Sequence, residues 1–159
     1  MSGLNHVATG ALVAVAINRP ILALPAAFLS HFVIDALPHY SHGALLLSRP
    51  KLYRLVIILD ALFSAALLVS LAIILNRSAW LVIGGGILAL LPDLMWFSVL
   101  KNHKFPKADS KTLLDRLRRF HSKIQIHESP DGVNFSPREI CFEVAWFVAV
   151  LILILHIGR

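Results

Sequence analysis

Long apolar runs dominate the sequence and limit the folds that are open to it. Residues 55–75 contain a single charged side chain, Asp60. A run of about 20 apolar residues is enough for one α-helix to cross the hydrocarbon core of a bilayer, which is about 30 Å thick. Hydrophobic residues make up 57% of the chain and charged residues 15%, and the mean hydropathy is +0.74, which is far from a soluble composition. We therefore predict an all-α integral membrane protein.

Prolines and polar turns divide the chain into about five apolar helices that would pack as a bundle. Residues 1–100 would form a four-helix membrane core, in which 4–37 and 51–100 could be two copies of one duplicated hairpin. Residues 139–159 would add a C-terminal membrane helix. The expected helices cover residues 4–17, 20–37, 51–75, 79–100 and 139–157.

The segment between the fourth and fifth helices, residues 101–138, is polar and carries nine of the basic residues. Within it, four apolar residues recur at helical spacing between basic ones: Leu113, Leu117, Phe120 and Ile124. This pattern predicts a basic amphipathic helix that lies at the membrane interface, with Asp109 or Ser110 as its cap.

The distribution of basic residues predicts the orientation in the membrane. If all five apolar segments span, residues 39–54 and 101–138 lie on the N-terminal side and hold twelve of the fifteen Lys and Arg residues. The positive-inside rule then places the N-terminus in the cytoplasm and the C-terminus outside, which suits an inner (cytoplasmic) membrane protein. The single cysteine, Cys141, excludes an internal disulfide.

Ionisable groups within the apolar helices gather towards the predicted cytoplasmic end. His31, Asp35 and His39 are four residues apart, a spacing that stacks side chains on one helix face. Asp35 and Asp93 each lie sixteen residues after an arginine in a polar turn, so at 1.5 Å per residue both return about 24 Å towards that end. The groups expected at this depth are His6, His31, Asp35, His39, Asp60, Asp93 and, from the basic segment, His121.

Imidazole and carboxylate side chains together suggest a metal site. They are the ligands that zinc, manganese and non-haem iron accept, and helical bundles can hold such sites in their cores. A charge near the middle of a bilayer costs roughly 2.5 to 3.5 kcal/mol, and one divalent ion would neutralise two carboxylates at once. A bound ion could also lower the pKa of a water molecule towards 7 and make hydroxide available for hydrolysis.

Each of these groups also has a simpler explanation. His31 and Asp35 could hydrogen-bond each other across one helical turn, and Asp60 and Asp93 could pair with Lys or Arg at the interface. The remaining histidines could be ordinary interface or solvent-facing residues, which applies to His6, His39, His42, His103, His121 and His127.

Several short motifs resemble those of a known group of membrane proteins. They are Ser30-His31-Phe32-Val33-Ile34-Asp35 with Pro38-His39, the early His6-x-x-Thr9-Gly10, and Leu91-Pro92-Asp93. They look like the membrane-bound metal-dependent hydrolases, typified by the LexA-regulated inner-membrane hydrolase, and more loosely like zinc-dependent phospholipase C-like helical proteins. The resemblance covers most of the first hundred residues, and it implies that His6, His31, Asp35 and Asp93 are metal ligands. Leu94-Met95-Trp96 stands where that family continues with a further acid and histidine.

The resulting hypothesis is a membrane-embedded hydrolase with zinc or manganese bound by His6, His31, Asp35 and Asp93. His39 would be a further ligand, and Asp60 and His121 would take part in catalysis. A phosphoester, such as a phospholipid head group at the cytoplasmic leaflet, would suit the basic residues nearby. The alternative is a non-enzymatic metal-binding or structural membrane protein, either a carrier or an assembly factor. Nucleic-acid binding is disfavoured because the aromatic residues of 101–138 are widely spaced.

Overall fold

The computed structural model describes residues 1–39, 49–75, 79–97, 111–125 and 137–158, and these parts of the chain form helices without any strand. The all-α class is therefore confirmed. In chain order the elements are α1 (Gly3–Ile17), α2 (Pro20–Asp35), α4 (Pro50–Ile74), α5 (Ala79–Leu90), the 3₁₀-helix η2 (Leu91–Trp96), α7 (Leu113–Ile124) and α8 (Pro137–Ile157).

Prolines set several of the helix boundaries. Pro20, Pro50 and Pro137 are the first residues of α2, α4 and α8, where the absence of an N–H group costs nothing. Pro92 instead ends an α-helix, because it lies inside the predicted fourth helix. The α-helix ends at Leu90 and the chain tightens into η2, so the prediction that one α-helix continues to residue 100 is wrong.

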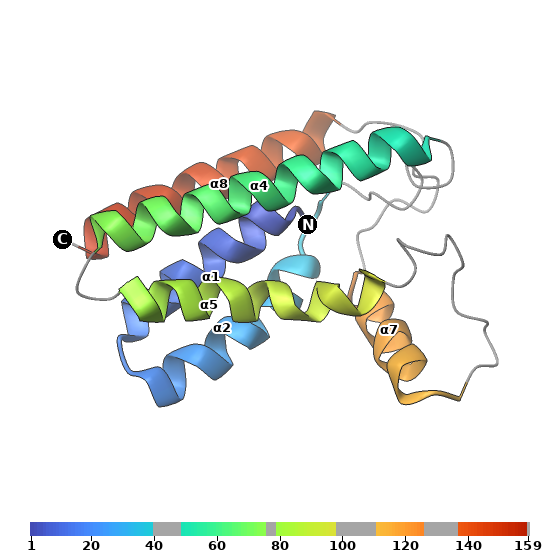
Figure 1. Ribbon diagram of the computed structural model, residues 1–159, viewed down its shortest axis with the longest axis horizontal. Coiled ribbons are helices and arrows are strands. Elements are labelled where there is room, and N and C mark those ends of the chain that lie inside the picture. The colour runs from blue at the N-terminus through green and yellow to red at the C-terminus, as the bar shows by residue number, and fades with distance from the viewer. Residues whose placement is uncertain (40–48, 76–78, 98–110, 126–136, 159) are drawn as a thin grey trace.

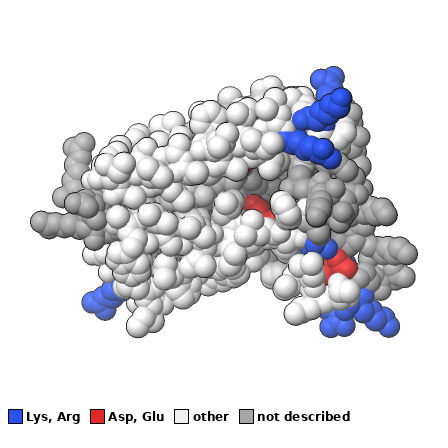
Figure 2. Space-filling model, viewed as in Figure 1, with Lys and Arg blue, Asp and Glu red and all other residues white. Residues whose placement is uncertain are grey.

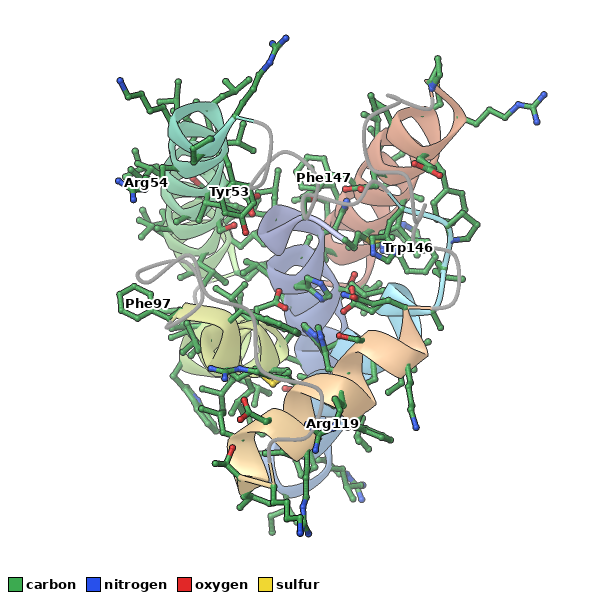
Figure 3. All side chains as sticks on the ribbon, turned by 90° about the vertical axis from the view of Figure 1, so that its right-hand side faces the viewer. Tyr53, Arg54, Phe97, Arg119, Trp146 and Phe147 are labelled. Carbon is green, nitrogen blue, oxygen red and sulfur yellow. The ribbon has the colours of Figure 1, made fainter. Side chains whose placement is uncertain are left out.

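The helix α1 occupies the middle of the bundle and packs against α2, α4, α5 and α8. Figure 1 shows α4 and α8 on one side of α1, with α5 and α2 on the other. Figure 3, turned to look along the bundle from one end, shows α4 and α8 spread apart with α1 between them. The core around α1 is made of the buried side chains Ala8, Ala11, Val15, Leu71, Leu75, Val82, Val150 and Ile154.

Among the described residues, three helical stretches are long and apolar enough to cross a membrane: α4, α5 continued through η2, and α8. Only 11% of the most apolar window of α4 and of α8 is buried inside the protein, so these helices present apolar side chains outwards, as lipid contact requires. With 15 and 16 residues, α1 and α2 are shorter than the roughly 20 residues that a span needs. The count of five spans, and the orientation derived from it, stay predictions.

The described basic residues gather at one end of the bundle. Apart from Arg19, they belong to the start of α4, the start of α8, and α7 with its preceding residues. Figure 2 shows most of the blue side chains at the end that carries α7, on an otherwise mostly white surface. The cap of α7 is Thr112, whose hydroxyl oxygen accepts the Asp115 N–H at 3.2 Å, rather than Asp109 or Ser110, which lie outside the described residues.

The contact between α1 and α5 is tight enough to predict the effect of a single methyl group. A Cβ at Gly85 would lie 2.6 Å from the backbone oxygen of Gly10 and 2.7 Å from Ala14 Cβ, whereas a Cβ at Gly84 would meet only Leu24 Cδ2, at 3.2 Å. We expect Gly85→Ala to lower the free energy of unfolding by about 1–3 kcal/mol, because the two backbones must separate.

The neighbouring substitution Gly84→Ala is the matched control. It should change the free energy of unfolding by less than about 0.5 kcal/mol, since the flexible Leu24 side chain can move aside. Denaturant unfolding of both variants in the same mild detergent measures the difference. Equal stabilities would show that α1 and α5 do not approach at Gly85.

Candidate metal centre

Five ionisable side chains converge at the end of the bundle that carries α7. They come from four elements that lie far apart in the sequence. The first turn of α1 supplies His6, the C-terminal part of α2 supplies His31 and Asp35, η2 supplies Asp93, and α7 supplies His121. Figure 3 looks onto this end and shows α7 crossing it in front of α2.

Local structure explains how each element positions its ionisable side chain in the cluster. His31 and Asp35 are one turn apart on α2, so both point towards the same neighbour. Asp93 belongs to η2. Because η2 contacts α2, the Asp93 side chain reaches the cluster beside the end of α2. On α7 the two buried side chains are Arg118 and His121, three residues apart and therefore on one face. The Arg118 guanidinium holds this face of α7 against η2, because its Nε donates a hydrogen bond to the backbone oxygen of Met95 at 2.9 Å.

Asp35 is the centre of the cluster. Its Oδ2 lies 3.2 Å from Nε2 of His31 and 3.0 Å from Nε2 of His121, and its Oδ1 lies 3.1 Å from Nε2 of His6. Asp93 faces the same three rings. Its Oδ1 lies 3.7 Å from Nε2 of both His31 and His121, and its Oδ2 lies 3.8 Å from Nε2 of His6. Each carboxylate thus turns one oxygen towards His6 and the other towards His31 and His121.

The cluster is closed to solvent except at Asp93. The side chains of His6, His31, Asp35 and His121 are at most 1% exposed, whereas that of Asp93 is 34% exposed. Burying two carboxylates requires positive charge or hydrogen bonds nearby. The ammonium nitrogen of Met1 lies 2.9 Å from Asp35 Oδ1, and Gln125 Nε2 donates to Asp35 Oδ2 at 3.3 Å. The ammonium offsets one of the two negative charges.

The ligand atoms of His31, Asp35, Asp93 and His121 all lie within 4.8 Å of one another, so this group could hold a metal ion. Ligands that bind an ion at about 2.1 Å are themselves about 3.4 Å apart in a tetrahedral site, so small movements would be enough. Nitrogen and carboxylate-oxygen donors suit several divalent ions, and the geometry does not select one. Nε2 of His6 is close to both carboxylates, at 3.1 Å from Asp35 and 3.8 Å from Asp93, but His6 is not one of the four residues in this group.

The hydrogen bonds at Nδ1 of His31 and of His121 place the ring proton on different nitrogens of the two residues. Nδ1 of His31 lies 2.8 Å from the Ala89 carbonyl oxygen, which can only accept, so Nδ1 carries the proton and Nε2 turns a lone pair towards the carboxylates. The reverse holds for His121, because the indole N–H of Trp96 donates to its Nδ1 at 3.2 Å and leaves the proton on Nε2. The 2.7 Å contact between the two Nε2 atoms is then an ordinary N–H···N hydrogen bond.

His6 has an unusual environment for a buried imidazole. Its ring stacks on that of His31 with centroids 4.0 Å apart, and neither of its nitrogens has a hydrogen-bond partner among the described residues. Nε2 is close to Asp35 Oδ1, but the angles are not those of a hydrogen bond. Buried polar atoms without partners are rare in proteins, and a nitrogen with a free lone pair beside two carboxylates suits a metal ligand.

Two residues that the sequence placed with this cluster have other contacts. The carboxylate of Asp60 on α4 accepts the backbone N–H groups of Gly3 at 2.7 Å and of Leu4 at 3.0 Å, so it caps the start of α1. Both of its oxygens are used there, and the group within ligand distance does not include it. A catalytic role for Asp60 is therefore not supported by its contacts.

His39 is buried just beyond the end of α2, where its Nδ1 donates to the Leu37 carbonyl oxygen at 2.7 Å. Burial lowers the pKa of His39, and the positive charge of the N-terminal ammonium acts in the same direction, so the ring is neutral at pH 7. His39 is not within ligand distance of the cluster, so its role as a further ligand stays a prediction. His42, His103 and His127 lie outside the described residues.

Sequence reasoning missed three contributors to the site. Trp96 is an aromatic residue in an apolar stretch, so its indole N–H gives no distinctive sequence signal, and the Ala89 contact uses a backbone oxygen, which no side-chain pattern can reveal. Gln125 could have been found, because it follows His121 by four residues and therefore shares its face of the helix.

No protein-family model, no curated protein and no solved structure matches this chain. The resemblance to membrane-bound metal-dependent hydrolases therefore stays a prediction, and the function is argued from the geometry of the site.

Proposed function

We propose that this protein is a membrane-embedded, metal-dependent hydrolase. Its metal ligands would be His6, His31, Asp35 and Asp93, and His121 would donate a hydrogen bond to the reacting group. The observation that carries this proposal is the convergence of three imidazoles and two carboxylates from four separate helices on one largely buried point.

Electrostatics favours a divalent ion over pairing among the side chains alone. If the three imidazoles are neutral, the described group that offsets the two carboxylates is the ammonium of Met1, which contacts Asp35. The Met1 ammonium leaves one negative charge unbalanced, which a divalent ion would more than offset, and the same ion would give the unpartnered His6 nitrogen something to bind. The proton on Nδ1 of His31, held by a backbone carbonyl, is the usual arrangement for a metal-binding histidine. Zinc or manganese suits this mixture of nitrogen and oxygen donors.

The chemistry supported by this site is hydrolysis. A bound divalent ion would polarise the scissile group and lower the pKa of a water molecule, so that hydroxide is available near pH 7. Nε2 of His121 lies 3.0 Å from Asp35 Oδ2, and its N–H can donate a hydrogen bond to an oxygen that gains negative charge in the reaction. Trp96 keeps that proton on Nε2, because its indole N–H occupies Nδ1. A substrate would approach past Asp93, the exposed member of the group.

A phosphoester is the substrate class that suits the surroundings. Basic residues of α7 and of the start of α4 lie at the same end of the bundle as the cluster and could hold a phosphate. A phospholipid head group would reach this end from the leaflet, which the positive-inside rule makes the cytoplasmic one. The membrane that fits best is accordingly the inner (cytoplasmic) membrane.

The test is metal-dependent hydrolysis by the purified protein. The full chain in mild detergent would be stripped with a chelator, reloaded with zinc or manganese, and assayed with a soluble phosphodiester and with phospholipids. We expect hydrolysis to fall at least about 100-fold on stripping and to return on reloading, because the nucleophile depends on the ion. Asp35→Asn, taken through the same procedure, controls for contaminating enzymes. Hydrolysis that is equal before and after stripping would contradict the proposal.

A second candidate, a structural role without catalysis, is favoured by the hydrogen bonds within the cluster. The contacts His31–Ala89, Trp96–His121 and Gln125–Asp35 already link α2, α5, η2 and α7. A non-enzymatic protein of this kind would purify without bound metal, and zinc would leave its thermal unfolding unchanged. A carrier would need polar groups along the bundle, and among the described residues the ionisable groups towards the opposite end are Arg19 and His156.

A further inference from the structure

The helix α7 has three distinct sides, and the described parts of the chain cover one of them. Arg118 and His121 face the bundle and are buried. With about 100° of rotation per residue, Leu113, Leu117, Phe120 and Ile124 fall within a narrow stripe roughly a quarter turn from that buried side. Arg116 and Lys123 fall about a quarter turn beyond the stripe. The apolar stripe therefore lies between the docked face and a basic face.

The apolar stripe is exposed along most of its length. Leu113 is 73% exposed, Leu117 49% and Phe120 57%. Phe120 makes one described aromatic contact, with Phe32 on α2, at 6.1 Å between ring centroids. A row of large apolar side chains on a surface helix is unfavourable in water and marks a surface that contacts something else.

The charges beside the stripe indicate what that contact is. Lys111, Arg116 and Lys123 are exposed and Arg119 is half-buried, whereas the one acid of α7, Asp115, accepts hydrogen bonds from Thr112 and Arg118. A basic face that includes the exposed Arg116 and Lys123 beside an apolar stripe complements a bilayer surface, with acyl chains for the stripe and anionic head groups for the basic side chains. A protein partner would need a matching acidic groove, whereas a lipid leaflet already surrounds this bundle.

We propose that α7 docks on an anionic lipid leaflet, with Leu113, Leu117, Phe120 and Ile124 in the acyl boundary and Arg116 and Lys123 at the head groups. The contacts of α7 with the bundle are made chiefly by Arg118, His121 and Phe120, so the leaflet supplies much of what holds the helix in place. The proposal goes beyond the proposed function and does not depend on a bound metal, because it concerns only where the helix lies.

Spin labels on two sides of α7 test this in the full chain. Leu117→Cys and Ser122→Cys would each be made with Cys141→Ser, labelled, and placed in nanodiscs of neutral lipid or with about one third anionic lipid. Ser122 is the matched control, since it is exposed and lies on the side away from the stripe. In anionic discs we expect the label at 117 to be several-fold more accessible to oxygen than to a water-soluble nickel complex, and the label at 122 to show the reverse.

A charge variant tests the role of the head groups. Arg116→Gln with Lys123→Gln should abolish the difference between anionic and neutral discs, whereas Lys51→Gln with Arg138→Gln, two exposed cations at the same end but outside α7, should leave it intact. Water accessibility of the label at 117 in anionic discs would overturn the proposal. So would equal depth in neutral and anionic lipid.

Discussion

Replacing Asp35 with asparagine is expected to lower the amount of bound divalent metal by more than about tenfold, because the substitution removes a central ligand and its charge together. Asp35 contacts all three imidazoles of the cluster, at 3.0 to 3.2 Å, so no other carboxylate can replace it without rearrangement. Elemental analysis of the purified wild type and variant, after the same dialysis, measures the change. Full metal stoichiometry in Asp35→Asn would refute the ligand assignment.

Asp60→Asn is the control for that experiment. Asp60 lies at the same end of the bundle and also accepts two hydrogen bonds at short distance, but from the backbone of Gly3 and Leu4. An asparagine can still accept one of these bonds through its carbonyl oxygen, so α1 should remain in place. The metal content should match that of the wild type. Loss of metal in both variants would place Asp60 in the site after all.

The second large effect is expected at His121. Replacing it with alanine should lower hydrolysis by roughly 10²–10³-fold, the usual contribution of one positioned hydrogen-bond donor to developing negative charge, while the metal content stays at the wild-type level. The reason is the Trp96 N–H, which occupies Nδ1 and leaves a proton rather than a lone pair on Nε2. Parallel measurement of turnover and of bound metal in His121→Ala separates the two roles. If metal and turnover are lost together, His121 is a ligand.

Trp96→Phe gives a finer test of the same arrangement. The phenyl ring keeps most of the packing against His121 but removes the N–H that selects its protonated nitrogen. Turnover should fall, by less than in His121→Ala, and bound metal should not change. A variant that behaves like the wild type in both measurements would show that Trp96 does not position His121.

Spacing along single helices predicted much of the cluster correctly. The interval between His31 and Asp35 placed both on one face, and equal distances from the preceding polar turns brought Asp35 and Asp93 to one level, where both face the same histidines. Asp60 shows the limit of that reasoning. The depth of a residue along a helix does not determine how that helix is rotated about its own axis. The helix α4 is rotated so that the Asp60 carboxylate contacts the first turn of α1 instead.

The end of the fourth predicted helix shows a second limit. Its apolar pattern continues past Leu90, but Pro92 cannot extend the α-helical hydrogen bonding, and the tighter η2 sets where Asp93 and Trp96 point. The position of α7 depends on a contact between a guanidinium and the backbone oxygen of Met95. Backbone acceptors carry no sequence signal, so this docking could not be derived from residue patterns.

The close crossing of α1 and α5 at Gly10 and Gly85 has a consequence for the choice of ion. His6 lies one turn before Gly10, and Asp93 lies shortly after the end of α5, so both are mounted on backbones that already touch and cannot move closer. A small ion must therefore draw its ligands in through the side chains of His6 and Asp93, or through α2 and α7, and not through a closer approach of α1 and α5. Calcium, which takes six to eight oxygen ligands, suits this mixture of imidazole and carboxylate donors less well than an ion that accepts nitrogen.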